Sequence, residues 1–220
     1  MALAAANTPD SPHLEWIRPP MQERTRLTLG RMLDAAEKLV AEKGFSETGI
    51  AEIARAAGTS VGGFYRRFHD KDGLLQALHD RFCEEARATA DAALDPGRWS
   101  GASTADIVRQ FSAFLIQIYR ERAGAFRAFM LASLTDESVR RRTLELRRHL
   151  HQRFAALLAE RRAELAHPDP DLGSAFAIDF ILGTLSQAVQ FQQETLGLAD
   201  PRLDSELPRL FLAYLGVRAD

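Results

Sequence analysis

Cysteine is almost absent from this 220-residue chain, in which Cys83 is the only one. A single cysteine excludes a disulfide framework and is typical of a reducing compartment, so we expect a cytoplasmic protein. No apolar run reaches the roughly 18 residues that suggest a membrane span. The first twenty residues contain no charged stretch followed by an apolar one. We therefore expect no membrane partner and no secretory signal.

An excess of positive charge is also missing. The 28 lysine and arginine residues are balanced by 30 aspartate and glutamate residues, which gives a formal net charge of −2. Any binding of nucleic acid must therefore rest on local geometry rather than on overall charge. No histidine–cysteine cluster has the spacing of a metal site, and we expect no cofactor. Hydrophobic residues form 46% of the chain, enough for a sizeable core.

The alternation of apolar and polar residues that marks a β-strand is absent as well. Apolar residues instead recur with helical spacing, beginning with Leu29, Met32, Leu33, Ala36 and Val40. Gly44 and Gly58 are predicted to end the first two helices, and Ser60 and Asp70 to cap the next two. The fold class is therefore predicted to be all-α.

Longer helices are predicted beyond a break at residues 93–102. Their expected ranges are 103–120, 123–134, 136–165, 171–196 and 205–215. The sequence HPDPD at 167–171 should end one helix and open the next, and Pro208 is tolerable only in a first turn. Cys83, among apolar neighbours, is expected to be a buried small hydrophobe.

The segment Gly58-Thr59-Ser60-Val61-Gly62 fits two incompatible patterns. One is the G-x-S-x-G nucleophile elbow of a serine hydrolase, with Ser60 as nucleophile. That elbow follows a β-strand and needs a histidine base, whereas residues 50–57 have helical spacing and nothing marks a histidine for that role. The other pattern is a helix-turn-helix, with helix 50–57, a tight turn and helix 61–67. We favour the second.

In that interpretation Phe64 and Phe68 face the core. The exposed side is then predicted to hold Val61, Gly62, Gly63, Tyr65 and Arg66. Two adjacent glycines each cost a helix about 1 kcal/mol relative to alanine, and close approach to a DNA backbone would favour them. Val61 is predicted to contact a base through its apolar side chain. Lys71 lies in the first turn of a helix, where a bound phosphate would stabilise its charge.

Residues 31–78 resemble the DNA-binding domain of the TetR family of bacterial transcriptional regulators. Their sequence is RMLDAAEKLVAEKGFSETGIAEIARAAGTSVGGFYRRFHDKDGLLQAL, with the specific pattern F-Y-x-x-F-x-x-K near its end. The resemblance implies a homodimer with a three-helix DNA-binding head and a divergent helical, ligand-binding body. It implies helix capping and a phosphate contact for Thr48, and DNA contacts for Thr59, Ser60, Val61, Gly62, Gly63, Tyr65 and Lys71. Gly49 stands where the family commonly has a hydroxyl residue.

We predict an arm at 1–20, the DNA-binding domain at 21–85 and an effector-binding and dimerisation domain at 86–220. Side chains of the body could line an apolar cavity with a few polar groups, although for each aromatic residue ordinary core packing is the better explanation. The candidates are Phe111, Phe114, Tyr119, Phe126, Phe129, Met130, Phe154, Phe176, Asp179, Phe180, Gln187 and Gln190. The two glutamines could equally flank a dimer interface. Helices 171–196 and 205–215 are predicted to pair with a second copy, helped by Gly183 and Ala188.

The sequence therefore predicts a dimeric DNA-binding regulator rather than an enzyme. Its expected partners are double-stranded operator DNA, a second copy of the chain and a small apolar or amphipathic effector that releases a repressor from its operator. One alternative is a ligand-binding protein whose head no longer binds DNA, which Gly49, Gly63 and the weak basicity favour. A serine hydrolase that uses Ser60 is the other.

Overall fold

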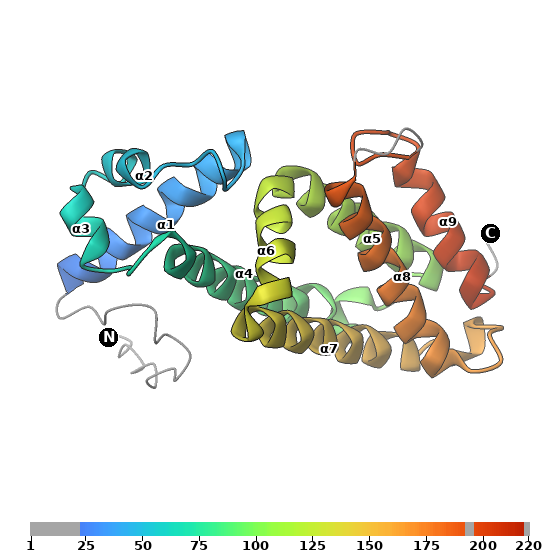
Figure 1. The fold of residues 1–220 in the computed structure, drawn as a ribbon. Coiled ribbons are helices and arrows are strands. Elements are labelled where there is room, and N and C mark those ends of the chain that lie inside the picture. Colours follow the sequence, from blue (N-terminus) through green and yellow to red (C-terminus); the bar gives the residue numbers. More distant parts are fainter. Residues whose placement is uncertain (1–22, 192–195, 218–220) are drawn as a thin grey trace, which may run out of the picture.

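The computed structural model describes residues 23–191 and 196–217. Within these residues the chain forms helices joined by turns and no β-strand, which confirms the all-α prediction (Figure 1). The head consists of α1 (Glu23–Lys43), α2 (Ile50–Ala56) and α3 (Val61–Tyr65), and α4 (Lys71–Ala93) leads away from it. The body consists of α5 (Thr104–Glu121), α6 (Ala123–Thr135), α7 (Glu137–Ala159), α8 (Pro170–Gln190) and α9 (Leu203–Leu215). Short 3₁₀ turns lie at Pro96–Trp99 and Arg162–Glu164.

The glycines predicted to end the first two helices do end them, and the residues predicted to cap the next two do cap them. Gly44 follows α1 with a φ of +84°, and Gly58 follows α2 with a φ of +65°. This left-handed conformation is accessible to glycine without steric cost. The Ser60 side chain accepts a hydrogen bond from the Gly63 N–H at 3.0 Å, and Asp70 accepts one from the Gly73 N–H at 2.7 Å. Both predicted N-caps are thus confirmed.

Several predicted ends in the body are wrong. The helix expected at 136–165 ends at Ala159, and the 3₁₀ turn at Arg162–Glu164 follows it. The HPDPD segment therefore only opens α8, where Asp169 caps the Leu172 N–H at 3.1 Å and Pro170 is the first helical residue. The helix expected at 171–196 ends at Gln190, and residues 192–195 lie outside the described residues.

The predicted position of Pro208 within its helix is also wrong. Because α9 begins at Leu203, Pro208 lies in its interior rather than in its first turn. A proline there has no N–H to bond to the carbonyl four residues earlier, that of Asp204. The ring is buried, however, beside Leu207 and Phe211 on the core side of α9. Burial of the ring offsets part of the cost of the missing hydrogen bond.

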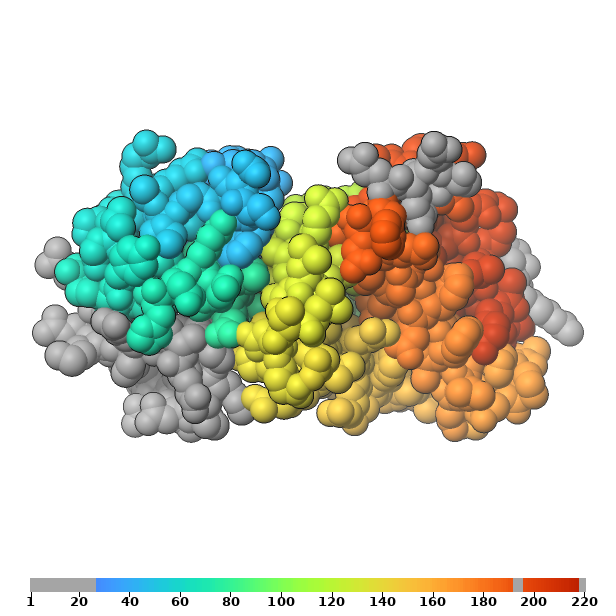
Figure 2. Space-filling model, in the orientation of Figure 1, coloured from blue at the N-terminus to red at the C-terminus, as the bar shows by residue number. Residues whose placement is uncertain are grey.

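Two hydrophobic clusters form the core, and the second one joins the head to the body. The first lies within the body and includes Ile107, Phe154 and Ile178. The second holds the head together and includes residues from α1, α3 and α4 together with Ala125, Ala128 and Phe129 of α6. In Figure 2 the blue surface of the head adjoins the yellow surface of α6. The head therefore packs directly on one helix of the body.

The α4 helix runs through the predicted domain boundary at residues 85 and 86. It begins at the head with Lys71 and continues to Ala93, where it packs along α7. A single continuous helix thus carries residues of both predicted domains.

The α8 helix is long and apolar enough to cross a membrane by length and composition, with a mean hydropathy of 1.4. Half of that stretch is buried inside the protein, however. Ile178, Ile181 and Leu185 pack into the body cluster. The core helix of a globular protein has the same character.

Candidate nucleic-acid interface and ligand cavity

The α2 and α3 helices are joined by the tight turn that the sequence predicts, although each helix ends slightly earlier. The Thr59 N–H donates to the Ala54 carbonyl at 2.9 Å, which closes the turn around Gly58. Ser60 then caps α3 through its hydroxyl. Because a helix and not a strand precedes Ser60, the segment lacks the geometry of a nucleophile elbow. It is a helix-turn-helix.

One side of α3 faces solvent. Val61 and Tyr65, four residues apart, are 41% and 46% exposed, and Ser60, Gly62 and Arg66 are exposed beside them. Thr59, in the turn, is half-buried. The opposite side is held down by the fully buried Phe64, whose ring centroid lies 5.2 Å from that of Phe68. Removing either ring would cost about 3–5 kcal/mol. The structure thus fixes α3 through Phe64, which packs on Phe68 just beyond the helix, and leaves the opposite side of α3 available.

The two glycines of α3 have different environments. A Cβ on Gly63, which is buried, would lie 2.3 Å from the Thr59 Oγ1, so a side chain there requires the Thr59 hydroxyl to move. The prediction that Gly63 lies on the exposed side is therefore wrong, and internal packing accounts for its identity. A Cβ on Gly62 would meet only the Ser60 Oγ, at 3.8 Å. Nothing among the described residues requires a glycine at 62.

The predicted capping role of Thr48 is also wrong. Gly49 is the N-cap of α2, without a side-chain hydrogen bond. Thr48 is only 1% exposed, and its hydroxyl donates to the Gly44 carbonyl at 2.8 Å. That carbonyl lies beyond the end of α1 and needs a donor when buried, so Thr48 stabilises the loop between α1 and α2.

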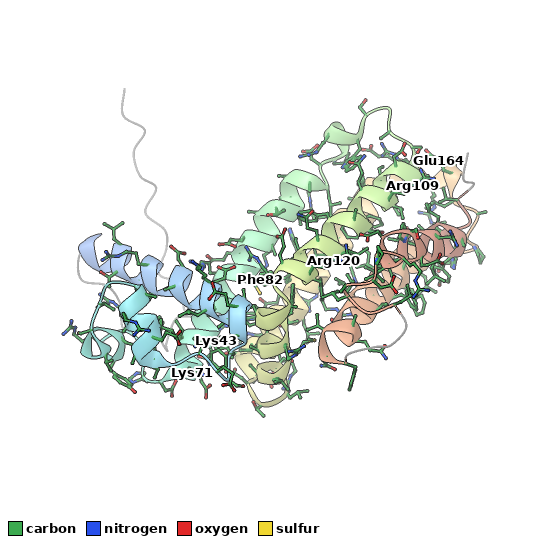
Figure 3. All side chains as sticks on the ribbon, turned by 90° about the horizontal axis from the view of Figure 1, so that it is seen from above. Lys43, Lys71, Phe82, Arg109, Arg120 and Glu164 are labelled. Atoms are coloured by element: carbon green, nitrogen blue, oxygen red, sulfur yellow. The ribbon has the colours of Figure 1, made fainter. Side chains whose placement is uncertain are left out.

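Lys43 lies at the end of α1, and Lys71 contacts the loop that follows α1 (Figure 3). The Lys71 ammonium donates to the Ser46 carbonyl at 3.1 Å and lies 4.4 Å from the centre of the Phe45 ring. An ammonium has three N–H donors, so this contact leaves Lys71 able to bind a further acceptor. Lys43 instead pairs with Glu52, and this ion pair lowers the pKa of the Glu52 carboxyl.

A cavity of about 380 Å³ lies in the body, between α4, α5, α6, α7 and α8. Half of the predicted ligand-binding residues line it. They are Phe111, Phe114, Tyr119, Phe126, Phe129 and Met130. The Tyr119 ring stacks on the Phe126 ring with centroids 4.0 Å apart, and the Tyr119 hydroxyl lies 3.3 Å from the Ser186 Oγ. The wall is therefore mostly apolar, with several aromatic rings and with hydroxyl and charged groups at a few points.

The other predicted residues do not line this cavity. Phe154 has no exposed surface and packs in the core against Phe111, with ring centroids 4.7 Å apart. Asp179 pairs with Arg147 at 2.7 Å on the flank of α7. Gln190 donates to the Met130 sulfur at 3.7 Å. Phe176, Phe180 and Gln187 are exposed on the outer face of α8. The cavity side of α8 carries Leu182 and Ser186 instead.

Sequence reasoning missed the part of the wall that α4 supplies. His79, Phe82, Ala86 and Thr89 line the cavity from this helix. Because the predicted domain boundary lies at residue 85, the first half of α4 was assigned to the head. Its residues were therefore not expected to line the cavity. The helical spacing of Phe82, Ala86 and Ala90 was the available signal that the helix continues into the body.

The geometry defines a helix-turn-helix protein with a hollow helical body. Residues 32–78 match the family model described as bacterial regulatory proteins, tetR family. Residues 103–215, more than half of the chain, match the tetracyclin repressor-like C-terminal domain. The chain belongs to the tetR family of bacterial regulatory proteins, as the sequence resemblance implies.

Individual relatives agree with this assignment. The chain is 35% identical over 95 residues to an HTH-type transcriptional regulator of Mycobacterium tuberculosis (strain H37Rv), a match that covers 43% of this chain and 42% of that protein. It thus spans about two-fifths of that relative's length. The curated relatives that match are transcriptional regulators rather than enzymes.

Solved structures have the same fold. Salmonella enterica GusR superposes with a TM-score of 0.62 at 19% identity, over 90% of this chain and all of the other. RolR in complex with the ligand resorcinol superposes with a TM-score of 0.56 at 22% identity, over 90% of this chain and 91% of the other.

Proposed function

We propose that this protein is a cytoplasmic, dimeric, DNA-binding transcriptional regulator, and that a small effector in its body releases it as a repressor from operator DNA. The exposed side of α3 is the observation that carries the proposal. Val61, an apolar β-branched residue, is exposed at the start of a short helix whose other side is anchored in the core. A helix presented in this way fits the major groove, where Val61 would contact a thymine methyl group.

Neighbouring groups suit the DNA backbone. Tyr65 and Arg66 are exposed on the same side of α3, and the Lys71 ammonium lies at the start of the next helix. Hydroxyl, guanidinium and ammonium groups are common phosphate ligands, and such contacts orient a protein on DNA without reading its sequence. This division assigns sequence preference to Val61 and Gly62, and general affinity to Tyr65, Arg66 and Lys71.

The outer face of α8 and α9 supports dimerisation. It exposes apolar side chains from both helices, namely Leu172, Phe176, Phe180, Leu210 and Tyr214. The Phe176 and Tyr214 rings contact each other with centroids 5.3 Å apart, which makes the surface continuous. A Cβ on Gly183 would meet nothing within 4 Å, so a second helix can approach closely there. An apolar surface of this kind is typical of a contact between copies.

The cavity supports control by an effector. It is bounded by α4, the helix that also begins at the head. The RolR structure, whose fold is similar, contains resorcinol as ligand. A ligand that binds more tightly to the body of the DNA-free geometry shifts the protein away from DNA, whereas equal affinity for both geometries shifts nothing. We infer that the effector acts by changing the orientation of α4.

A gel shift with DNA that flanks the protein's own gene tests DNA binding. The full-length protein should bind a site there more tightly than random DNA of equal length, and Val61→Ala should alter its base preference. Leu144→Ala, an exposed change on α7, is the matched control and should alter neither. If flanking and random DNA bind equally weakly, the head does not act on an operator near this gene.

Light scattering after size-exclusion chromatography tests dimerisation. Phe176→Glu and Phe180→Glu place charge in the exposed apolar surface and should convert a dimer into a monomer. Leu144→Glu adds the same charge to an equally exposed position on α7 and should leave the dimer intact. A wild-type monomer, or a dimer unaffected by both substitutions, would contradict the proposed interface.

A further inference from the structure

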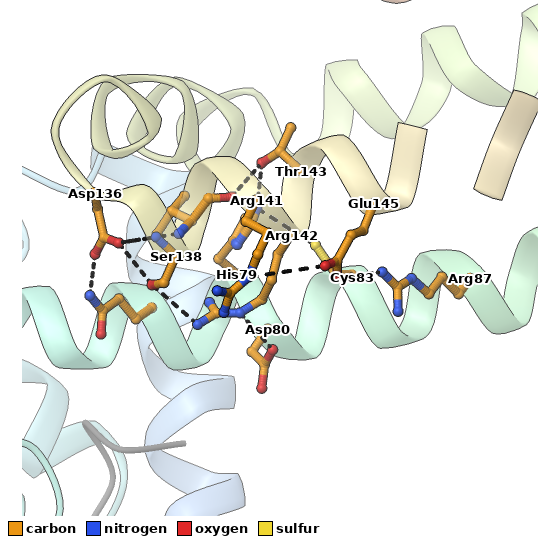
Figure 4. A network of polar contacts seen from close by, with 12 residues as sticks. His79, Asp80, Cys83, Arg87, Asp136, Ser138, Arg141, Arg142, Thr143 and Glu145 are labelled. Atoms are coloured by element: carbon orange, nitrogen blue, oxygen red, sulfur yellow. Dashed lines mark hydrogen bonds and ion pairs between the residues drawn. The ribbon is translucent and has the colours of Figure 1, made fainter. Parts of the chain in front are cut away.

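His79 lies in the cavity wall on α4, with only 2% of its surface exposed (Figure 4). Its Nε2 lies 3.0 Å from the Thr143 Oγ1, and that hydroxyl donates its own proton to the Val139 carbonyl at 3.0 Å. Thr143 can therefore only accept from His79, which assigns the ring proton to Nε2. The Cys83 sulfur, a weak acceptor 3.6 Å from the same nitrogen, agrees with this tautomer.

The other ring nitrogen of His79 is consequently a hydrogen-bond acceptor. Nδ1 is buried and has no hydrogen-bond partner among the described residues. Burial and the nearby Arg142 guanidinium lower the pKa of His79 to about 4, so the ring is neutral and Nδ1 keeps its lone pair at neutral pH. Buried acceptors are normally satisfied, and one beside a cavity points to a missing donor.

The charged groups of the cavity wall already have partners. They pair as Arg122 with Glu37 and Glu85, Arg147 with Asp179, and Glu121 with the Gln117 amide. These groups are partly exposed, whereas His79 is 2% exposed. A charged ligand that reached His79 would bury its charge away from water with no free counter-ion among these groups, which is costly. An uncharged ligand avoids this cost.

The aromatic residues of the cavity wall favour one kind of ligand framework. Six of its residues carry an aromatic ring, namely Phe82, Phe111, Phe114, Tyr119, Phe126 and Phe129. Flat apolar rings pack well against such a surface by offset or edge-to-face contacts.

We propose that the cavity binds an uncharged aromatic molecule that donates a hydrogen bond, from a hydroxyl or an N–H group, to the Nδ1 of His79. This inference rests on the proposed effector role of the cavity and names the class of effector.

Phe129 connects this hydrogen bond to the head. Its ring meets the His79 ring edge-on, with centroids 4.9 Å apart, and both residues line the cavity. Because Nδ1 is enclosed, a donor reaches it only when a neighbouring side chain moves, and we assign this movement to the Phe129 ring that packs on the His79 ring. Phe129 also belongs to the hydrophobic cluster that contains Met32 and Val40 of α1. Ligand binding therefore alters the packing between α6 and the head.

Calorimetry with matched naphthalene probes tests the hydrogen bond on the full-length protein. 2-Naphthol can donate a hydrogen bond, 2-methoxynaphthalene cannot, and 2-naphthoate is an anion. We expect 2-naphthol to bind about tenfold more tightly than 2-methoxynaphthalene, the effect of one hydrogen bond, and 2-naphthoate to bind least. His79→Phe should remove the preference for 2-naphthol, and Thr89→Val, at another polar position of the wall, should keep it.

Nitrogen-15 NMR of the histidine rings provides a measurement that needs no variant. The His79 Nδ1 signal should be that of a bare nitrogen and should move when 2-naphthol is added. Equal affinities for 2-naphthol and 2-methoxynaphthalene, tighter binding of 2-naphthoate, no binding of any probe, or an unmoved Nδ1 signal would each overturn the inference.

The gel shift separates this inference from the proposed function. Failure of operator binding would contradict the regulator, whereas the calorimetric preference judges the His79 contact alone. If 2-naphthol binds with the expected preference and leaves operator-bound protein in place, the coupling through Phe129 is wrong.

Discussion

The Nε of Arg142 lies 3.3 Å from the Oδ1 of Asp80, at the place where α7 packs on α4. Only 6% of the arginine side chain and 17% of the aspartate side chain are exposed. Arg142 also donates to the Ser138 Oγ at 3.3 Å. This ion pair holds α4, the helix that leaves the head, against α7, the longest helix of the body. The pair lies directly beside His79 (Figure 4).

Asp80→Asn should destabilise the protein. The substitution removes the carboxylate that faces a buried guanidinium, and the loss of one partner of a buried pair lowers the free energy of unfolding by roughly 3 kcal/mol. Urea denaturation measures this change. Glu145→Gln is the control, since Glu145 pairs with Arg87 at the surface and should contribute less than about 1 kcal/mol. Equal losses for the two variants would show that the Asp80 pair behaves as a surface pair.

The helices of the head could be predicted because local chemistry decides where they end. A glycine with a positive φ, as at Gly44 and Gly58, and a side chain that caps a helix, as at Ser60 and Asp70, act on residues adjacent in the chain. The placement of Phe64 and Phe68 is likewise local, because the Phe68 N–H donates to the Phe64 carbonyl four residues earlier at 3.0 Å.

The cavity wall could be predicted only in part, because it depends on how helices pack. Phe111 and Phe154 are both aromatic residues on amphipathic helices, yet one lines the cavity and the other fills the core. Asp179 is a polar residue on an apolar helix, which suggested a ligand contact, but α7 supplies Arg147 as its partner. A side chain at Gly63 would clash with Thr59, four residues earlier, and this contact depends on the turn between them.

The stability of the protein should depend on the protonation of His79. Its pKa is lowered to about 4 in the folded protein, by burial first and then by Arg142; in the unfolded chain a histidine titrates near pH 6.5. The unfolded state therefore gains the proton first, and the free energy of unfolding falls as the pH falls from about 6.5 to about 4. The full loss over this window is about 3 kcal/mol.

Urea denaturation at several pH values between 7 and 4 measures this loss. His79→Gln should lose less stability over the window than the wild type, and the exposed His69→Gln should follow the wild type. Parallel curves for His79→Gln and the wild type would mean that His79 is protonated in the folded protein.

The two glycines of α3 should respond differently to alanine. Gly62→Ala meets no close contact, so it should keep or raise the melting temperature, because alanine is favoured in helices by about 1 kcal/mol. It should weaken operator binding if DNA approaches the helix there. Gly63→Ala should lower the melting temperature, because its Cβ would displace the Thr59 hydroxyl. The double variant with Thr59→Ala should recover stability; if it does not, another contact restricts position 63.

Lys71 should contribute one phosphate contact. Its ammonium already binds the Ser46 carbonyl and faces the Phe45 ring, which holds it at the start of α4 near the end of α3. Lys71→Ala should weaken binding to operator and random DNA by similar factors. It should also lower the slope of log K against log salt concentration by about one unit, because one fewer counterion is released. Fluorescence anisotropy with labelled DNA, between low and moderate salt, measures the slope.

Lys43→Ala provides the matched control for this lysine. Lys43 lies at the end of α1, just before the loop that Lys71 contacts, and is neutralised by Glu52. Its removal leaves the Glu52 carboxylate unpaired and so changes the general charge of the head by the same amount. We expect the slope of Lys43→Ala to remain within about half a unit of the wild-type value. If both variants lower the slope equally, the effect reflects the charge of the head, and Lys71 makes no specific phosphate contact. If neither lowers it, Lys71 lies outside the interface, and its contact with Phe45 and Ser46 serves only to hold the loop between α1 and α2.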